Sequence, residues 1–254
     1  MRTYLDLVPT DGTLTLPVHY SDIVQGFIYR AMGDTSLSSH VHDHGVRTVD
    51  GKPAKLFAFS RLTSDRFTID RHAKTITFVG VVRLVVTSAL DEMIYDLTTS
   101  LLKEKRITLN GRQLTVRQAR MQAYSGTVTQ TQVRCLSPIT VYRTLTQSNG
   151  RKFTQYYKPG TDEFNMLLRQ NLAFKSRALG HDATIEDIEL EITPVVAGAM
   201  RERILLFHGS PIHAWEGDFR IQGTARELEL AWNAGLGAKG SAGFGVVEVF
   251  AQGR

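Results

Sequence analysis

Strand-like and helical patterns follow one another in the same order in both halves of this chain, and this repeat limits the folds open to it. In the first half, residues 2–8 alternate like a strand, and a helical stretch runs from Ser21 to Gly33 after Pro17. Apolar side chains recur at helical spacing again within residues 88–105. Between and after these two helices the sequence predicts strands, at residues 55–62, 66–69, 74–86 and 107–123. The order is β-α-β-β-α-β.

The second half repeats this order. Residues 132–143 predict a strand with Pro138 at an edge or a bulge, and helices are predicted at residues 161–179 and 224–235. Further strands are predicted at residues 185–196, 201–209, 213–223 and 246–250.

Two such halves predict an α+β fold. We expect tandem ferredoxin-like (RRM-like) βαββαβ domains, each an antiparallel sheet with its helices on one face. The predicted domains cover residues 1–126 and 127–254. A single larger α+β domain stays open as the alternative.

The composition is that of a globular protein, because 42% of the 254 residues are hydrophobic and 22% are charged. Cys135 is the single cysteine, so an internal disulfide is impossible, which favours a reducing compartment and a cytoplasmic location. The apolar runs are too short for a signal peptide or a membrane-spanning helix, and we expect neither.

Basic residues are concentrated in one segment of a chain whose net charge is +5. Residues 127–180 hold eight basic side chains against Asp162 and Glu163, whereas the final 74 residues hold six basic and eleven acidic ones. The eight are Arg134, Arg143, Arg151, Lys152, Lys158, Arg169, Lys175 and Arg177. Such a segment is typical of a protein that binds a polyanion, although a solvated charged face gives the same pattern.

The most distinctive segment, GLGAKGSAGFG at residues 235–245, contains five glycines just before the last predicted strand. It differs from a dinucleotide fingerprint because it follows a helix and opens a strand, and from a P-loop because Ser241 and Ala242 replace the required Lys and Ser or Thr. A helix cap and a hairpin would explain two of the glycines. We expect the backbone here to face outward and lie against a phosphate chain, with Lys239 adding charge.

This segment resembles the signature of the RAMP superfamily of CRISPR-associated proteins, which is GLG, five residues, then GFG, before the C-terminal strand. Within that superfamily the chain is similar to the sixth Cas family, the endoribonucleases that cleave CRISPR precursor transcripts within their repeats. Further family motifs follow along the chain, GFIYRAM at 26–32, HDHG at 42–45, KLFAFSRL at 55–62 and CLSPITV at 135–141. The resemblance spans essentially the whole chain.

The resemblance implies metal-independent cleavage of RNA without a cofactor. The 2′-hydroxyl attacks its own phosphate, which leaves a 2′,3′-cyclic phosphate and a 5′-hydroxyl. The implied partners are CRISPR repeat RNA and other Cas subunits of an effector complex, with no membrane partner, and the chain is a monomer or a homodimer.

The resemblance places the catalytic histidine at His42, which precedes an acidic residue and stands three residues before a glycine. His44 and His40 stay open as alternatives. A tyrosine of the family corresponds to Tyr29, and a helix wheel independently places Tyr29 on the face opposite the apolar one.

The resemblance also implies a basic residue near the scissile phosphate. This residue is Lys55 at the start of a predicted strand, with Lys52 as the alternative. The residues expected to bind RNA are Gly235, Gly237, Lys239, Gly240, Gly243, Gly245, Lys52, Arg134, Arg143, Arg151 and Lys152.

Two other functions compete with this one. A noncatalytic RAMP subunit that holds guide RNA in an effector complex would share the glycine motif and the fold. A metallohydrolase would use the histidines of HVHDHG at residues 40–45, but Asp43 lies one residue too early for the usual hydrolase pattern. We therefore expect no metal site.

Overall fold

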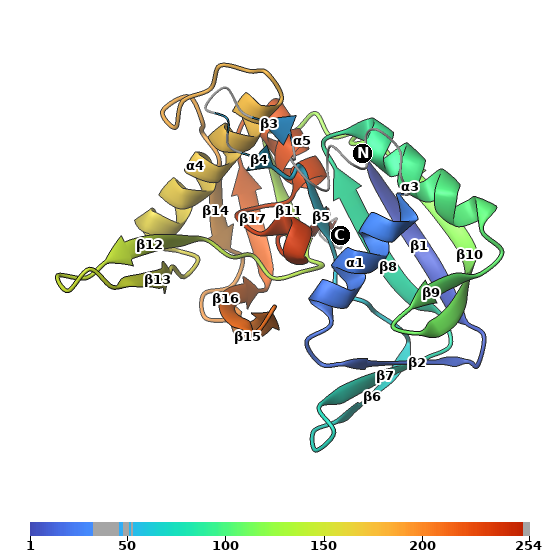
Figure 1. The fold of residues 1–254 in the computed structure, drawn as a ribbon. Helices are drawn as coiled ribbons and strands as arrows, with labels where there is room; N and C mark the ends of the chain where they lie inside the picture. The colour runs from blue at the N-terminus through green and yellow to red at the C-terminus, as the bar shows by residue number, and fades with distance from the viewer. Residues whose placement is uncertain (33–45, 48–50, 52, 251–254) are drawn as a thin grey trace.

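The computed structural model describes residues 1–32, 46–47, 51 and 53–250 of the chain. The two halves of the sequence form two lobes side by side, each with a central sheet and helices packed against it (Figure 1). None of the helices in the described part combines the length and the apolar character that a membrane crossing requires.

The first half contains a five-stranded antiparallel sheet in the order β5-β8-β1-β10-β9. Its strands are β1 (Arg2–Pro9), β5 (Phe57–Phe59), β8 (Val82–Ser88), β9 (Ile107–Leu109) and β10 (Arg112–Gln122). Helices α1 (Ser21–Ala31) and α3 (Asp91–Lys103) pack on one face and share a single apolar core with the sheet (Figure 1). This is the strand order of a ferredoxin-like domain, as the sequence predicts.

Two predicted strands are broken by turns. The run at residues 74–86 divides at Gly80, whose φ of +78° turns the chain, into β7 (Thr75–Val79) and β8. Strand β7 joins β2 (Thr13–Pro17) and β6 (Arg66–Asp70) in a separate three-stranded sheet. The run at 107–123 folds back at Asn110 and Gly111, whose positive φ values suit a tight hairpin turn.

The second half repeats the architecture with a four-stranded antiparallel sheet in the order β14-β17-β11-β18. Its elements are β11 (Gln130–Cys135), α4 (Asp162–Ala178), β14 (Glu191–Pro194), β17 (Asp218–Gln222), α5 (Ala225–Ala234) and β18 (Val247–Val249). Helix α5 begins with a capping box between Thr224 and Glu227. The tandem ferredoxin-like fold expected from the sequence is confirmed.

Three two-stranded hairpins extend beyond these sheets. They are β3 (Val46–Arg47) with β4 (Pro53–Ala54), β12 (Tyr142–Thr146) with β13 (Lys152–Tyr156), and β15 (Arg201–Phe207) with β16 (Ser210–Glu216). The strand predicted at 132–143 therefore ends at Cys135, and the residues beyond Pro138 lead into the hairpin β12–β13 instead.

The two halves meet through a buried arginine. Arg2 is fully buried, and its guanidinium donates hydrogen bonds to the carbonyl oxygens of Val247 at 3.0 Å and Trp232 at 2.8 Å. It also stacks on the Trp232 ring at 3.4 Å. Burial lowers the pKa of Arg2 to about 10. Because β1 carries Arg2 and the C-terminal half supplies both acceptors, these bonds fix one sheet against the other half.

Candidate active site

Two of the predicted catalytic residues lie in direct contact. The Lys55 ammonium, exposed just before β5, donates a hydrogen bond of 2.8 Å to the Tyr29 hydroxyl in the last turn of α1. The Tyr29 ring meets the buried Phe57 edge to face, with 5.7 Å between the ring centroids. Helix α1 and the segment leading into β5 thus hold a phenol and an ammonium side by side.

The helix wheel is partly wrong about Tyr29. Val24, Phe27 and Ile28 are buried as the apolar face predicts, but Tyr29 is half-buried and packs against the same core. The reason is that β5 lies beside α1 and brings Phe57 beneath the tyrosine ring. A helix wheel contains no information about other elements, so it cannot predict burial by a neighbouring strand.

The candidate histidines His40, His42 and His44 lie outside the described residues, as does Lys52. Along the sequence, the described residues on either side of the histidines are near neighbours of Tyr29 and Lys55. On one side, Met32 follows Tyr29 by three residues; on the other, Val46 pairs with Ala54, the residue before Lys55. Among the described residues, no group of three or more His, Cys, Asp and Glu side chains could hold a metal ion.

The glycine-rich segment contradicts its predicted exposure. Gly235, Gly237, Gly243 and Gly245 are buried, whereas Gly240 and Lys239 are half-exposed. Five of the backbone N–H groups expected to face a phosphate donate instead to protein oxygens: Leu236 to Gly245, Ala238 to Thr140, Ala242 to Lys239, Gly243 to Gly240, and Gly245 to Pro138. The outward-facing ribbon predicted from the sequence is therefore wrong, because the protein itself uses these donors.

Packing explains why this segment has so many glycines. A β-carbon on Gly237 would lie 2.5 Å from the Thr140 carbonyl oxygen, and one on Gly245 would overlap the Leu236 carbonyl. Both glycines also have positive φ, of +72° and +81°. A β-carbon on any of the other three glycines would lie 2.7 or 2.8 Å from an atom of β5, at Phe57, Ala58 or Phe59. The segment fills the space between the two halves.

A buried lysine on α4 forms hydrogen bonds with the backbone of this segment. The Lys175 ammonium on α4 donates hydrogen bonds to the carbonyl oxygens of Gly235 at 2.6 Å and Gly237 at 3.0 Å. Only 6% of Lys175 is exposed, and burial lowers its pKa to about 7. A neutral amine retains two N–H donors, so both hydrogen bonds persist when the group loses its proton. In the sequence Lys175 belongs to the basic segment, but its helical spacing from Leu168 and Leu172 places it on the apolar face of α4, which is the signal for this buried role.

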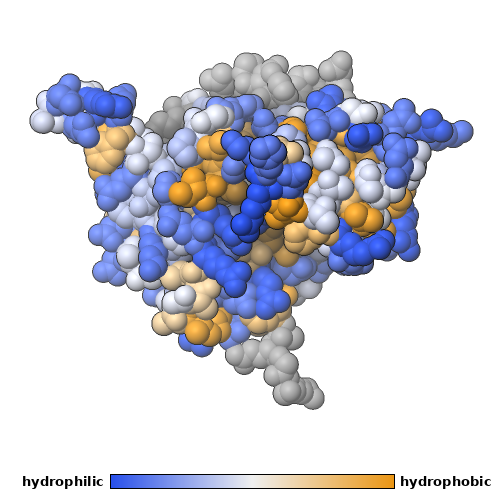
Figure 2. Space-filling model, turned by 90° about the horizontal axis from the view of Figure 1, so that it is seen from below, coloured by the Kyte–Doolittle hydropathy of each residue, from blue (hydrophilic) through white to orange (hydrophobic). Residues whose placement is uncertain are grey.

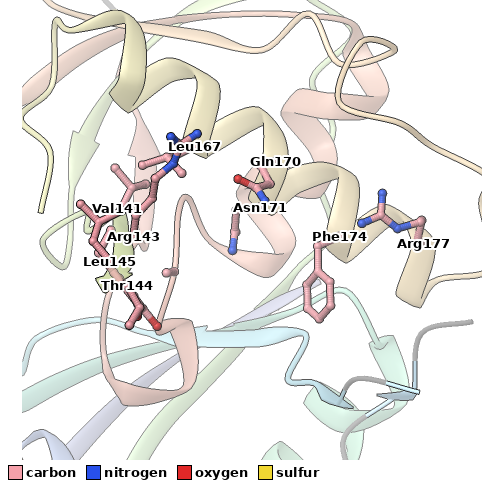
Figure 3. Close-up of a pocket in the computed structure, with 11 residues that line it drawn as sticks. Val141, Arg143, Thr144, Leu145, Leu167, Gln170, Asn171, Phe174 and Arg177 are labelled. Carbon is pink, nitrogen blue, oxygen red and sulfur yellow. The ribbon is translucent and has the colours of Figure 1, made fainter. Parts of the chain in front are cut away.

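A cavity of about 600 Å³ opens between β12 and α4, beside the glycine-rich segment (Figure 3). Arg143 is among its lining residues, and Ala238 contributes from the glycine-rich segment. Next to Ala238, the Lys239 ammonium lies 5.1 Å from the centre of the Tyr142 ring. Predicted RNA-binding residues from two separate segments thus meet at one opening.

Arg151 and Lys152 lie farther out on the same hairpin and are exposed. Among the residues that the structure describes, no carboxylate forms an ion pair with either of them, nor with Arg143 or Lys55. These four cations are therefore not neutralised by a neighbouring acid in the described part of the protein.

Arg134 belongs to a different surface. It lines a hollow of about 910 Å³ on the underside, between the two halves (Figure 2). Its guanidinium pairs with both carboxylate oxygens of Asp218 at 2.8 Å, and Arg61 and Arg203 each pair with Glu216 at 2.8 Å. Burial opposes ionisation of Glu216, but these two arginines hold the pKa of its carboxyl below its usual value. Of the arginines of this hollow, Arg61, Arg134 and Arg203 are therefore paired with acids, whereas Arg201 has no acidic partner among the described residues.

Comparison with known proteins places the chain in a family. The family model described as "CRISPR associated protein Cas6, C-terminal" matches residues 121–249. A curated relative from Pyrococcus furiosus, named "CRISPR-associated endoribonuclease Cas6", is 26% identical and is aligned with 98% of this chain and 90% of its own length.

Two solved structures agree in fold along the whole chain. One, titled "Characterization of a Cas6-related gene from Pyrococcus furiosus", has a TM-score of 0.81 at 17% identity and covers 100% of this chain and 99% of its own. Another, titled "An RAMP protein binding different RNA substrates", has a TM-score of 0.80 at 19% identity and covers 99% and 100%. The family model alone matches more than half of the sequence, and the chain belongs to the Cas6 family of CRISPR-associated proteins.

Proposed function

We propose that this protein is an endoribonuclease that binds CRISPR precursor transcripts and cleaves them within their repeats. One observation carries the proposal: a lysine and a tyrosine are held 2.8 Å apart beside the ends of the segment that contains His42. Family membership supports it, since the curated relative is named as an endoribonuclease. We propose the cytoplasm as the location, because its reducing conditions keep a single unpaired thiol such as Cys135 reduced.

The chemistry requires no metal ion. The 2′-hydroxyl of RNA stands beside its own phosphate, and such an intramolecular attack has an effective molarity of ~10⁵ M or more when the backbone is held in line. The protein has to remove a proton from the 2′-oxygen, return one to the departing 5′-oxygen and stabilise the charge that develops on the phosphate. The products are a 2′,3′-cyclic phosphate and a 5′-hydroxyl.

In this mechanism His42 is the general acid or base, because an imidazole with a pKa of about 6.5 exchanges protons near neutral pH. His44 and His40 are the alternatives. Lys55 binds a non-bridging oxygen of the phosphate and stabilises its developing charge. The hydrogen bond between Lys55 and Tyr29 fixes their spacing, so a phosphate bound at the ammonium lies within reach of the phenol, which positions the attacking hydroxyl.

The two halves divide the work in this proposal. Residues 1–126 carry the catalytic groups, and residues 127–254 bind the RNA. The hairpin β12–β13 carries three cations that have no acidic partner in the described part, Arg143, Arg151 and Lys152. In this proposal they make salt-dependent contacts with the phosphates of the RNA. Lys239 adds its charge at the base of that hairpin.

The test is incubation of the purified protein with a repeat RNA in excess EDTA, followed by analysis of the product ends. We expect cleavage at one site, with a cyclic phosphate on the upstream product. Zinc-dependent activity that EDTA removes would contradict the proposal, and so would tight binding without any product, which is the behaviour of a noncatalytic subunit.

The histidine assignment has its own test. We expect His42→Ala to reduce the single-turnover cleavage rate by at least ~10²-fold, because one positioned acid or base contributes about that much. Binding of the same RNA should change little, which a gel-shift titration checks. His40→Ala and His44→Ala are the matched controls. If His42→Ala cleaves at the wild-type rate and one of the controls does not, the assignment passes to that residue.

A further inference from the structure

The cavity between β12 and α4 has a lining that simple phosphate binding does not explain. Arg143 and Arg177 stand at opposite ends, and between them α4 presents Gln170, Asn171 and Phe174 (Figure 3). None of the eleven lining residues is acidic. The volume of about 600 Å³ lies within the range of roughly 300–1,000 Å³ that is typical of small-ligand sites.

We propose that this cavity binds one unpaired base of the repeat RNA and reads its identity. The proposal rests on the proposed function and names a specificity site for it. Phe174 supplies the stacking surface, and Gln170 and Asn171 contact the edge of the base. Sequence-specific recognition of RNA uses unstacked bases that stack on aromatic side chains and form hydrogen bonds along their exposed edges.

The amides are available for this role. Gln170 is exposed and Asn171 is half-buried, and neither side chain forms a hydrogen bond with another residue in the part of the protein that the structure describes. Each amide offers one donor and one acceptor side by side. Adenine presents a complementary pair at N6 and N7, and the other unpaired bases present one along their Watson–Crick edges, so the placement of the two amides sets which base is preferred.

The cavity lies next to the catalytic pair. Phe174 packs against the small apolar cluster of Ala54, Leu56 and Ala178. Ala54 and Leu56 are buried on either side of Lys55, which is exposed. Alternation along an extended segment therefore sends Lys55 toward Tyr29 and its two neighbours toward α4. A nucleotide in the cavity and a phosphate at Lys55 lie on the two sides of this one segment.

The two arginines at the ends of the cavity are placed to contact the phosphates on either side of a base bound in it. Arg143, which donates a weak hydrogen bond to the Met166 sulfur at 3.5 Å, stands beside the cavity on β12. Arg177 donates to the Ala183 carbonyl at 2.7 Å, which leaves its other N–H groups to face the opening. Cations at both ends fit a chain whose phosphates pass on either side of an inserted base.

The experiment measures binding of a repeat RNA that carries a 2′-deoxy substitution at the scissile nucleotide, so that no cleavage interferes. A set of RNAs with one abasic nucleotide at each position near the cleavage site is titrated against the wild-type protein. We expect one position at which the loss of the base weakens binding by about 10-fold or more, as the loss of base stacking and edge contacts predicts. The four bases are then compared at that position.

The variant Gln170→Ala/Asn171→Ala should flatten the preference at that one position and leave the ranking at all other positions unchanged. Phe174→Leu keeps an apolar side chain in the cluster while removing the stacking surface, and should lose the effect of the abasic nucleotide. Gln118→Ala is the matched control, because Gln118 is an exposed amide on β10 outside the cavity lining.

The outcomes separate the two proposals. If the wild-type protein neither binds nor cleaves repeat RNA, the proposed function fails. If it binds and cleaves, but the double variant keeps the full base preference of the wild type, the cavity is not the reading site. A uniform loss of affinity at every position would also overturn the base-reading role, since it would indicate a general contact with the backbone.

Discussion

The glycine-rich segment and the Tyr29–Lys55 pair both lie beside β5, but the two differ in nearly every respect. The segment is the most distinctive pattern in the sequence, yet most of it is buried and five of its N–H groups are bonded within the protein. Tyr29 and Lys55 stand out little in the sequence, yet Lys55 is exposed, Tyr29 is half-buried, and the ammonium and the hydroxyl lie 2.8 Å apart. A rare pattern of residues can therefore reflect a requirement of packing, while the proposed chemistry lies with less conspicuous neighbours.

The two lysines at this place show the same contrast. Lys175 is buried and donates to two carbonyl oxygens, and its pKa is low, so it works as a hydrogen-bond donor more than as a charge. Lys55 is exposed and has no acidic partner among the described residues, as the phosphate contact that we propose for it requires. Their surroundings separate the structural role of Lys175 from the binding role that we propose for Lys55.

The largest effect is expected at the segment itself. Gly245→Ala would push a β-carbon into the Leu236 carbonyl, and we expect it to lower the free energy of unfolding by at least ~4 kcal/mol or to prevent folding. Gly198→Ala is the control, because Gly198 also has positive φ but has open space around it. It should cost only about 1 kcal/mol. Equal costs in a urea titration would mean that the segment is loosely packed.

The next effect concerns Lys175 and depends on pH. The pKa of this ammonium is near 7 in the folded protein and near 10.5 when it is exposed, so the unfolded chain binds more protons between these values. Stability should therefore rise with pH from about 7 to 10, and the rise should be absent in Lys175→Met. Thermal melting of both proteins across this range measures the difference. A stability that falls equally in both would contradict the buried, neutral amine.

The smallest expected effect is on RNA binding, and it is tested by comparing variants of two arginines. Arg143→Ala removes a cation without an acidic partner in the described structure, and we expect RNA binding to weaken several-fold and the salt dependence of log K to lose about one unit of slope. Arg134→Ala should change the slope less, because Asp218 already neutralises Arg134. Should Arg134→Ala have the larger effect, the RNA runs through the hollow on the underside instead.

Much of the fold could be predicted from the sequence because its signals are local. The helical spacing at α3 and α4 and the alternation of β1 stand close to where they were predicted. The small sheet of β2, β6 and β7 was missed as a unit because it forms only when residues far apart pair, as Leu14 does with Phe78. The turn at Gly80 cannot be recognised from the pattern, because the residues on both sides of it are strand-like.

The candidate site was predictable in its membership but only in part in its surroundings. The family resemblance indicated Tyr29 and Lys55, and the structure brings these two together. It did not indicate that Asp218 pairs with Arg134, or that Lys175 lies beneath the glycines, because both depend on contacts between distant segments. Exposure of a glycine-rich backbone cannot be deduced from the glycines alone, since close packing and ligand contact both require the absence of a side chain.

The most direct test of the account is the single-turnover cleavage rate of Lys55→Ala on a repeat RNA in EDTA, with its unfolding free energy measured alongside. We expect the rate to fall by ~10²-fold or more, because the variant lacks the charge that stabilises the phosphate, while stability stays within ~0.5 kcal/mol of the wild type. Lys103→Ala, an exposed lysine at the end of α3, should cleave normally. A Lys55→Ala protein that cleaves at the wild-type rate would contradict the claim that the chemistry takes place at this pair.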